Sequence, residues 1–187
     1  GEIKGVKTIS GATYFSKAVV LCTGTYLNAR CLYGSVIEYT GPNGLKAATH
    51  LSDSLRANNV KLLRFKTGTP ARIDRRSIDF SKMTEQFGDP VITPFSFTND
   101  RRSIQKPQVS CFLTYTNEHT HDIIRAHLDE SPIYAGVIEG TGPRYCPSLE
   151  DKVVKFSEKK RHQLFIEPEG LMTNEMYVSG ASSSMPE

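Results

Sequence analysis

Cys146 is the residue of this chain whose surroundings most clearly suggest chemistry. It lies two positions before Ser148, and Asp151 follows three positions after that serine, which predicts a helix N-cap ahead of an apolar run with helical spacing. A thiol just before a helix start, with the cation of Arg144 two residues upstream, is favoured as the nucleophilic thiolate. We therefore predict a reactive cysteine. The alternative is an inert cysteine that fills a proline-bounded turn.

The same helix start is a candidate anion site, because free backbone N–H groups and the helix dipole both favour negative charge. Arg144 could hold a phosphate there, or stabilise an enolate that forms during a reaction. Lys152, in the first predicted helical turn, could do the same, with a solvated lysine as the plain alternative.

Two Thr-Gly-Thr turns are further candidates for ligand contact. The first, Thr23-Gly24-Thr25, follows residues 17–22, where four consecutive apolar residues and Cys22 come after Lys17 and predict a strand buried on both faces of a parallel sheet. Ligands of α/β folds bind at the carboxyl ends of such strands. The second, Thr67-Gly68-Thr69, follows Lys66, so that two loops could face one ligand and the lysine could meet an anionic group. Plain turns and a solvated lysine are the alternatives.

Strands and short helices are predicted to position these residues. The helical spacing of apolar residues covers 48–58, 118–129 with Asn117 as its cap, and 149–160. Strand patterns cover the hairpin of residues 2–9 and 12–15, and then residues 35–39, 60–65, 109–116, 163–167 and 172–178.

Cationic and aromatic residues gather between positions 72 and 136. Such a composition is compatible with RNA contact, because cations meet phosphates and rings stack on bases. The alternative is that the aromatic residues form the core of a small β-rich subdomain. Three histidines on or near the helix predicted there have a spacing that does not suit a metal pair: His119, His121 and His127.

The composition of the 187 residues, 38% apolar and 23% charged with a net charge of +3, is typical of a folded globular chain. No apolar run is long enough to span a membrane. The four cysteines show no CxxC spacing, which disfavours a zinc site and indicates free thiols in a reducing cytoplasm. The chain opens within a strand-like pattern and without an initiator methionine, so we expect a piece of a larger protein.

Five ordered segments that together cover essentially the whole chain resemble the glucose-inhibited division protein A family. This is the family of tRNA uridine 5-carboxymethylaminomethyl modification enzymes. The segments are AVVLCTGTYLNA, KTGTPARID, YTNEHTHDIIR, SPIYAGVIEGTGPRYCPSLEDKVVKF and HQLFIEPEGLMTNEMY.

The resemblance implies an α/β fold that is part of a Rossmann-type FAD-binding domain with an inserted α+β subdomain. Residues 1–70 would belong to the FAD-binding domain, residues 71–146 to the insertion, and residues 147–187 to the returning FAD-binding domain. The full-length enzyme would use FAD and NADH, with methylenetetrahydrofolate as carbon donor. It would act on tRNA in the cytoplasm, with a GTPase partner of the MnmE type, as a homodimer and without a membrane. The fragment alone is expected to be inactive.

The resemblance also implies roles for individual residues. Cys146 matches a family cysteine in the GPRYCPS motif, and a second reactive cysteine would lie in an N-terminal segment outside this chain. The backbone of Thr23, Gly24 and Thr25 would contact the flavin, whereas Ala48 replaces a serine assigned to the flavin in some members. The family's nicotinamide segment maps onto residues 142–156, which gives as cofactor-binding candidates Gly142, Pro143, Tyr145, Pro147, Ser148, Asp151 and Lys152.

In this role Cys146 would act at a uridine ring, with Arg144 beside it. C5 of a pyrimidine becomes a carbon nucleophile once a group adds to C6, and a thiolate can add there and later leave. Cys146 would either add in this way or transfer a proton. Two other functions stay open: a module that only binds tRNA or the partner, and a folate- and FAD-dependent tRNA uridine methyltransferase.

Overall fold

The computed structural model of this chain describes residues 2–41, 44–100, 104, 106–140, 142 and 146–186. The chain divides into two compact units, Gly1–Arg64 and Phe65–Glu187. Helices and strands occur in both, so the predicted α/β class is confirmed. In the described part of the chain, no helix is both long enough and apolar enough to cross a membrane.

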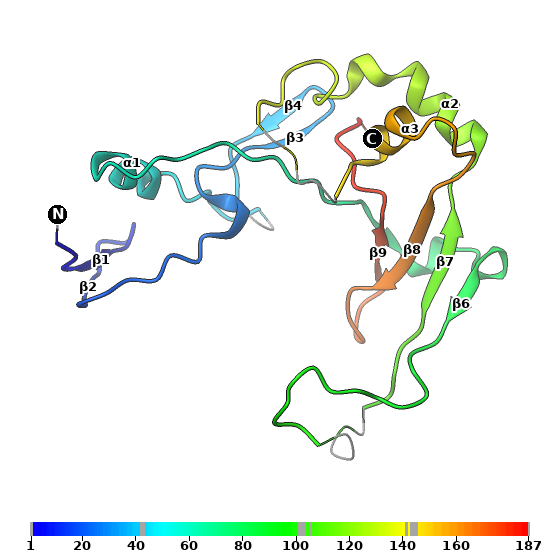
Figure 1. Ribbon diagram of the computed structural model, residues 1–187, viewed down its shortest axis with the longest axis horizontal. Helices are drawn as coiled ribbons and strands as arrows, with labels where there is room; N and C mark the ends of the chain where they lie inside the picture. Colours follow the sequence, from blue (N-terminus) through cyan, green and yellow to red (C-terminus); the bar gives the residue numbers. More distant parts are fainter. Residues whose placement is uncertain are drawn as a thin grey trace. The chain divides into compact units, whose positions relative to one another are not determined.

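In its described residues, the first unit contains two short hairpins, one α-helix and one short 3-10 helix (Figure 1). Strands β1 (Gly5–Lys7) and β2 (Thr13–Phe15) pair antiparallel, which confirms the predicted hairpin around Ser10-Gly11. Strands β3 (Cys31–Tyr33) and β4 (Val36–Glu38) form the second antiparallel pair. Helix α1 (His50–Ala57) lies within the range 48–58 that the apolar spacing predicts.

The prediction of a doubly buried strand over residues 17–22 is wrong. These residues form no strand, and the side chains of Val20 and Leu21 are 85% and 50% exposed. The strand predicted over residues 60–65 is also absent, and Leu63 is 66% exposed. A buried strand needs neighbouring strands to pair its backbone groups. The described residues of this unit place no such neighbour beside either segment.

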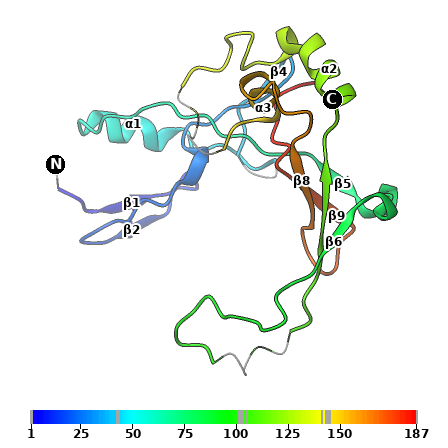
Figure 2. The ribbon, with the colours of Figure 1, turned by 45° about the vertical axis from the view of Figure 1, so that its right-hand side comes forward.

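The second unit is built on a five-stranded sheet in which every neighbouring pair is antiparallel (Figure 2). From one edge to the other, the strands are β5 (Arg72–Asp74), β9 (Glu175–Ser179), β8 (Gln163–Pro168), β7 (Cys111–Tyr115) and β6 (Thr84–Gln86). The sheet thus joins strands from the predicted insertion with strands from the predicted return segment. The boundaries at 70/71 and 146/147 stay a prediction.

Two helices in mutual contact connect β7 to the neighbouring strand β8 (Figure 1). Helix α2 (Glu118–Ala126) is capped as predicted, because the Asn117 side chain accepts a hydrogen bond from the backbone N–H of Thr120 at 2.9 Å. Helix α3 (Leu149–Lys155) begins as predicted but ends five residues before position 160. The residues after Phe156 are polar, so no apolar face continues that could hold a longer helix against the core.

Among the described residues, few large apolar side chains are buried, and those that are lie in the second unit: Ile124, Val153, Ile166 and Met176. The predicted aromatic core holds for Phe80 and Phe112, whose ring centroids are 4.4 Å apart. It is wrong for Phe87, Phe95 and Phe97, whose side chains are exposed in the long loop between β6 and β7. That loop runs out beyond the end of the sheet (Figures 1 and 2).

Candidate functional site

Cys146 has an exposed thiol at the edge of a small cavity in the second unit. The cavity holds about 20 Å³, which is room for roughly one water molecule. Cysteines react where the thiol is accessible and positive charge lies nearby. The other residues around the cavity come from four separate parts of the chain: Lys66, Thr67, Gly68, Ile133, Ile138, Ser148, Ser182 and Ser183.

The helix start beside Cys146 has the predicted cap. The Ser148 hydroxyl accepts a hydrogen bond from the backbone N–H of Asp151 at 3.2 Å. The N–H of Leu149 donates to the carbonyl of Ser182 at 2.7 Å, which ties this end of α3 to the segment that follows β9. Pro147, between the thiol and the cap, is half-buried.

Lys66 and Asp151 form an ion pair at 3.2 Å, although 85 positions separate them. Both side chains are largely buried, at 18% and 8% exposure. Lys155 approaches the other oxygen of the carboxylate at 2.7 Å, and the Tyr134 hydroxyl donates to it at 3.4 Å. The anionic group that the sequence predicts near Lys66 is therefore a carboxylate of the same chain.

This network shifts the pKa values of its members. Burial acts to raise the pKa of Asp151, but Lys155 and Lys66 outweigh it, and the pKa lies below its ordinary value. Burial, together with the neighbouring charge of Asp151, raises the pKa of Tyr134 to about 12. The carboxylate is thus held ionised and the phenol neutral near pH 7.

Lys152 provides a cation near the thiol. Its ammonium donates to the carbonyl of Gly180 at 2.6 Å. Burial lowers the pKa of Lys152, and its charge interaction with Cys146 opposes this shift. Lys152 is therefore one candidate for the cation that the proposed thiolate chemistry would use.

Glu150, which the sequence analysis did not single out, has a fully buried carboxylate at 0% exposure. Its Oε1 accepts from the Ser184 N–H at 2.9 Å and from the hydroxyls of Ser183, Ser184 and Ser131 at 3.0, 3.3 and 3.5 Å. Its Oε2 has no hydrogen-bond partner within the described ranges. Because Ser183 also lines the cavity, Glu150 holds one wall of the cleft around Cys146.

Two glycines allow the loops of this site to pack closely. A Cβ added to Gly68 would lie 3.0 Å from the Cβ of Ser182, and one added to Gly142 would lie 2.5 Å from Cε of Lys66. The second Thr-Gly-Thr turn and the predicted nicotinamide segment therefore meet at Lys66. The feature of the sequence that could have indicated this close packing is the glycine at each of the two positions.

The predicted site residues fall into three groups. One group surrounds the start of α3 or packs against Lys66: Gly142, Cys146, Pro147, Ser148, Asp151 and Lys152. A second group, Thr23, Gly24 and Thr25, lies in the first unit, where Gly24 to Tyr26 form the short 3-10 helix η1 (Gly24–Tyr26). The third group lies outside the described residues: Pro143, Arg144 and Tyr145.

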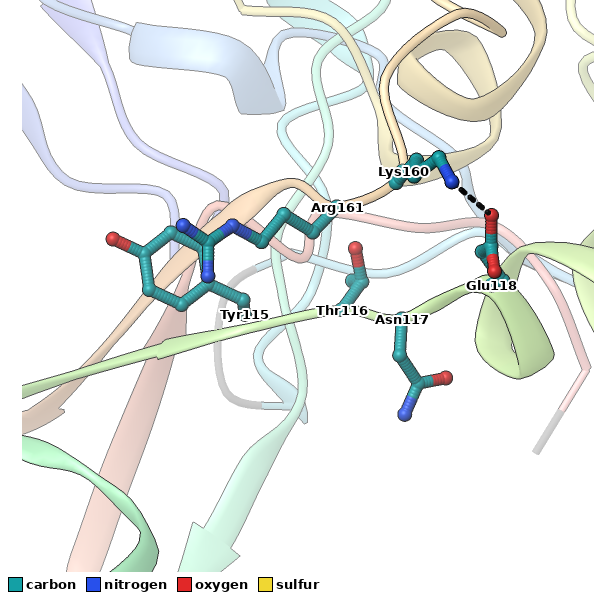
Figure 3. Close-up of a pocket in the computed structure, with 6 residues that line it drawn as sticks. All are labelled: Tyr115, Thr116, Asn117, Glu118, Lys160 and Arg161. Atoms are coloured by element: carbon teal, nitrogen blue, oxygen red, sulfur yellow. Dashed lines mark ion pairs between the residues drawn. The ribbon is translucent and has the colours of Figure 1, made fainter.

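A larger open groove of about 350 Å³ lies in the same unit, between the end of β7 and the chain that leads from α3 to β8 (Figure 3). It is lined by Tyr115, Thr116, Asn117, Glu118, Lys160 and Arg161. The sequence analysis predicts a helix over 149–160, which would end at Lys160, and does not pair Lys160 or Arg161 with Tyr115.

Residues 1–187 match the family model described as "Glucose inhibited division protein A". The tRNA uridine 5-carboxymethylaminomethyl modification enzyme MnmG of Lachnoclostridium phytofermentans is 66% identical over 186 residues, which cover 100% of this chain and 30% of that protein. The MnmG of Clostridium botulinum (strain Loch Maree) is 57% identical over 186 residues, covering 100% of this chain and 29% of that protein.

A solved structure of GidA from Aquifex aeolicus, in its form I crystal, superposes with a TM-score of 0.87 at 47% identity. The match covers 100% of this chain and 32% of that one. The form II crystal gives a TM-score of 0.84 at 44% identity, over 100% of this chain and 29% of that one. The chain thus spans about 30% of the length of the relatives that it matches.

Proposed function

Because this chain belongs to the glucose inhibited division protein A family, we propose that it is part of a flavin-dependent enzyme that installs a carboxymethylaminomethyl group on C5 of a wobble uridine in tRNA. The relatives at 66% and 57% identity carry the name of that modification. One observation of the structure supports the proposal most directly. The thiol of Cys146 is accessible, interacts with the charge of Lys152, and lines a small cavity. The Lys66–Asp151 ion pair and the Glu150–Ser184 hydrogen bond fix the segments that surround this cavity.

Cys146 would act on the uridine ring. Its thiolate adds to C6 and forms a C–S bond, while the electron pair of the C5–C6 double bond moves onto C5 and the C4 carbonyl as an enolate. C5 then forms a bond to an electrophilic carbon. Loss of the C5 proton and expulsion of the thiolate restore the double bond. The runner-up role is proton transfer to or from C5 by the same thiol.

Charges around the thiol would support this sequence. The ammonium of Lys152 offsets the negative charge of the thiolate before it adds and after it leaves. Arg144, which lies outside the described residues, would stabilise the enolate or hold a phosphate of the RNA. The Lys66–Asp151 pair keeps the first turn of α3 in place, and that turn carries Lys152.

The cofactor side of the proposal rests on Thr23, Gly24 and Thr25. Gly24 has a φ of +56°, nothing lies within 4 Å of the position where its Cβ would be, and Thr23 makes no side-chain capping bond. An exposed turn of this kind fits a cofactor that approaches the backbone closely, as FAD does. FAD would supply the transfer of electrons, with NADH as the reductant and methylenetetrahydrofolate as the carbon donor.

The nicotinamide side would be the segment around the start of α3. The polar atoms of Ser148 and Asp151 are buried and already bonded within the chain. These two residues would therefore shape the site rather than touch the cofactor. The remaining candidates for direct contact are Gly142, Pro143, Tyr145, Pro147 and Lys152.

We also propose the partners that the family implies: tRNA as substrate, a GTPase of the MnmE type, and a second copy of the full-length chain in a homodimer. The compartment would be the cytoplasm, and the chain by itself would be inactive. The names of the relatives favour this activity over a tRNA uridine methyltransferase.

The test is a Cys146→Ser substitution in a protein of the relatives' full length that carries this chain. We expect loss of the modified uridine, measured by mass spectrometry of digested tRNA, with the flavin absorbance retained. Cys111→Ser is the matched control, because this partly buried thiol lies in β7 and does not line the cavity. Modified uridine at the normal level in the Cys146→Ser protein would remove this cysteine from the mechanism.

A further inference from the structure

The groove at the end of β7 contains a stacked pair of a cation and a ring (Figure 3). The guanidinium carbon of Arg161 lies 4.2 Å from the ring centroid of Tyr115, and this ring remains 40% exposed. A guanidinium stacked on a ring forms a flat platform that carries a positive charge. Nucleobases stack on aromatic rings and on guanidinium planes alike.

Further cations stand beside this platform. Lys159, Lys160 and Arg161 are consecutive, and the ammonium of Lys159 lies 5.3 Å from the ring centroid of Phe156, itself 42% exposed. The same short segment thus makes a second contact of a cation with a ring, at Lys159 and Phe156. Stacking surfaces next to cations are the combination by which proteins hold single-stranded nucleic acid.

The one carboxylate of the groove does not block an anion. Glu118 lies 3.7 Å from the ammonium of Lys160, and the two side chains are 69% and 84% exposed. An exposed pair at this distance contributes little free energy, so Lys160 can exchange it for a phosphate. Figure 3 shows the pair at one end of the groove and the Arg161–Tyr115 stack at the other, which leaves the platform clear of the carboxylate.

We propose that this groove holds an unpaired nucleotide of an RNA loop, with its base on the Arg161–Tyr115 platform and its phosphate beside Lys160. The inference rests on the proposed function for its RNA substrate and adds a binding surface separate from the cavity at Cys146. The volume of about 350 Å³ lies within the range of small-ligand pockets and suits one nucleotide. An acidic protein segment would use the cations but has no need of the exposed rings.

The test is fluorescence anisotropy of the 187-residue chain with a labelled RNA stem-loop, compared with a fully paired RNA of the same length. Tyr115→Leu keeps apolar bulk but removes the stacking face, and we expect about tenfold weaker binding of the stem-loop. Lys160→Ala should weaken binding by a smaller factor. It should also reduce, by about one unit, the slope of the logarithm of the binding constant against the logarithm of the salt concentration. Lys61→Ala, an exposed lysine of the first unit, is the control and should bind like the unchanged chain.

Three results would overturn the inference: equal affinity for stem-loop and duplex, equal losses in Tyr115→Leu and Lys61→Ala, or displacement of the RNA by polyglutamate as efficiently as by unlabelled stem-loop. Far-UV circular dichroism of each variant checks its folding. The failure of this inference is separable from that of the proposed function. Cys146→Ser should leave RNA affinity unchanged, and Tyr115→Leu should leave the alkylation rate of Cys146 unchanged.

Discussion

The carboxylate of Glu150 accepts a hydrogen bond from the backbone N–H of Ser184 at 2.9 Å, across 34 positions of the chain. This bond joins the first turn of α3 to the segment after β9. Both segments line the cavity at Cys146, through Ser148 on one side and Ser183 on the other. The geometry around the thiol therefore depends on a buried side chain that does not itself line the cavity.

Replacing this carboxylate should destabilise the second unit. Glu150→Ala leaves a buried N–H and buried serine hydroxyls without their acceptor, at a cost of about 2–4 kcal/mol in the free energy of unfolding. Because the chain has no tryptophan, urea unfolding is best followed by far-UV circular dichroism. Glu158→Ala, at an exposed position shortly after α3, is the control and should change the free energy little. Equal effects of the two substitutions would contradict the assigned role.

Asp151 should make the chain sensitive to acid. Burial acts against its ionisation, but Lys155 and Lys66 outweigh it, so its pKa in the folded chain lies below the ordinary value of 3.8. The stability this provides is present above the unfolded pKa and is lost as pH falls through the folded pKa. We expect the free energy of unfolding to fall below about pH 4, and to fall less steeply in Asp151→Asn. A variant with an unchanged slope would show that other carboxylates govern the acid transition.

His162 should act in a higher pH range. Burial, with the positive charges of His121, Lys152 and Lys159, lowers its pKa below 6.5. Between the folded pKa and the unfolded value of 6.5, the unfolded chain binds more protons, so the free energy of unfolding falls as pH decreases through this window. When the free energy of unfolding is measured by urea unfolding at a series of pH values, it should change less with pH in His162→Gln than in the unchanged chain.

The control for that titration is His119→Gln, since this side chain is exposed. It should keep the slope of the unchanged chain. If the pH dependence of the free energy of unfolding were lost in the His119 variant and kept in the His162 variant, His162 would not be its cause. The ring of His162 lies 5.1 Å from that of His121, whose Nε2 is 2.7 Å from the Thr116 hydroxyl, so the His162 substitution should be checked for native circular dichroism first.

Lys152 should accelerate reactions of the Cys146 thiol. Lys152→Met removes a positive charge that interacts with Cys146, and we expect alkylation by iodoacetamide at neutral pH to slow by about threefold to tenfold. The rate is read at this cysteine by peptide mass spectrometry, with Cys22 in the same sample as an exposed internal reference. Alkylation of Cys146 that is unchanged relative to Cys22 would show that the ammonium has no such effect.

Several features of the site could be predicted because they depend on neighbours in sequence. The caps Asn117 and Ser148 bond to N–H groups three residues ahead, and the turn between β1 and β2 closes within a few residues. Residue type and spacing suffice for such local bonds. The same holds for the start of α3, whereas its end at Lys155 depends on where the core stops.

The sequence by itself determined the family, the caps, the hairpin and the candidate thiol. Only the tertiary structure decided that Lys66 pairs with Asp151, that Glu150 binds Ser184, and that Arg161 stacks on Tyr115. It also decided that residues 17–22 form no strand among the described residues. Contacts between distant positions follow from strand order and burial, and these depend on which surfaces the rest of the chain brings together.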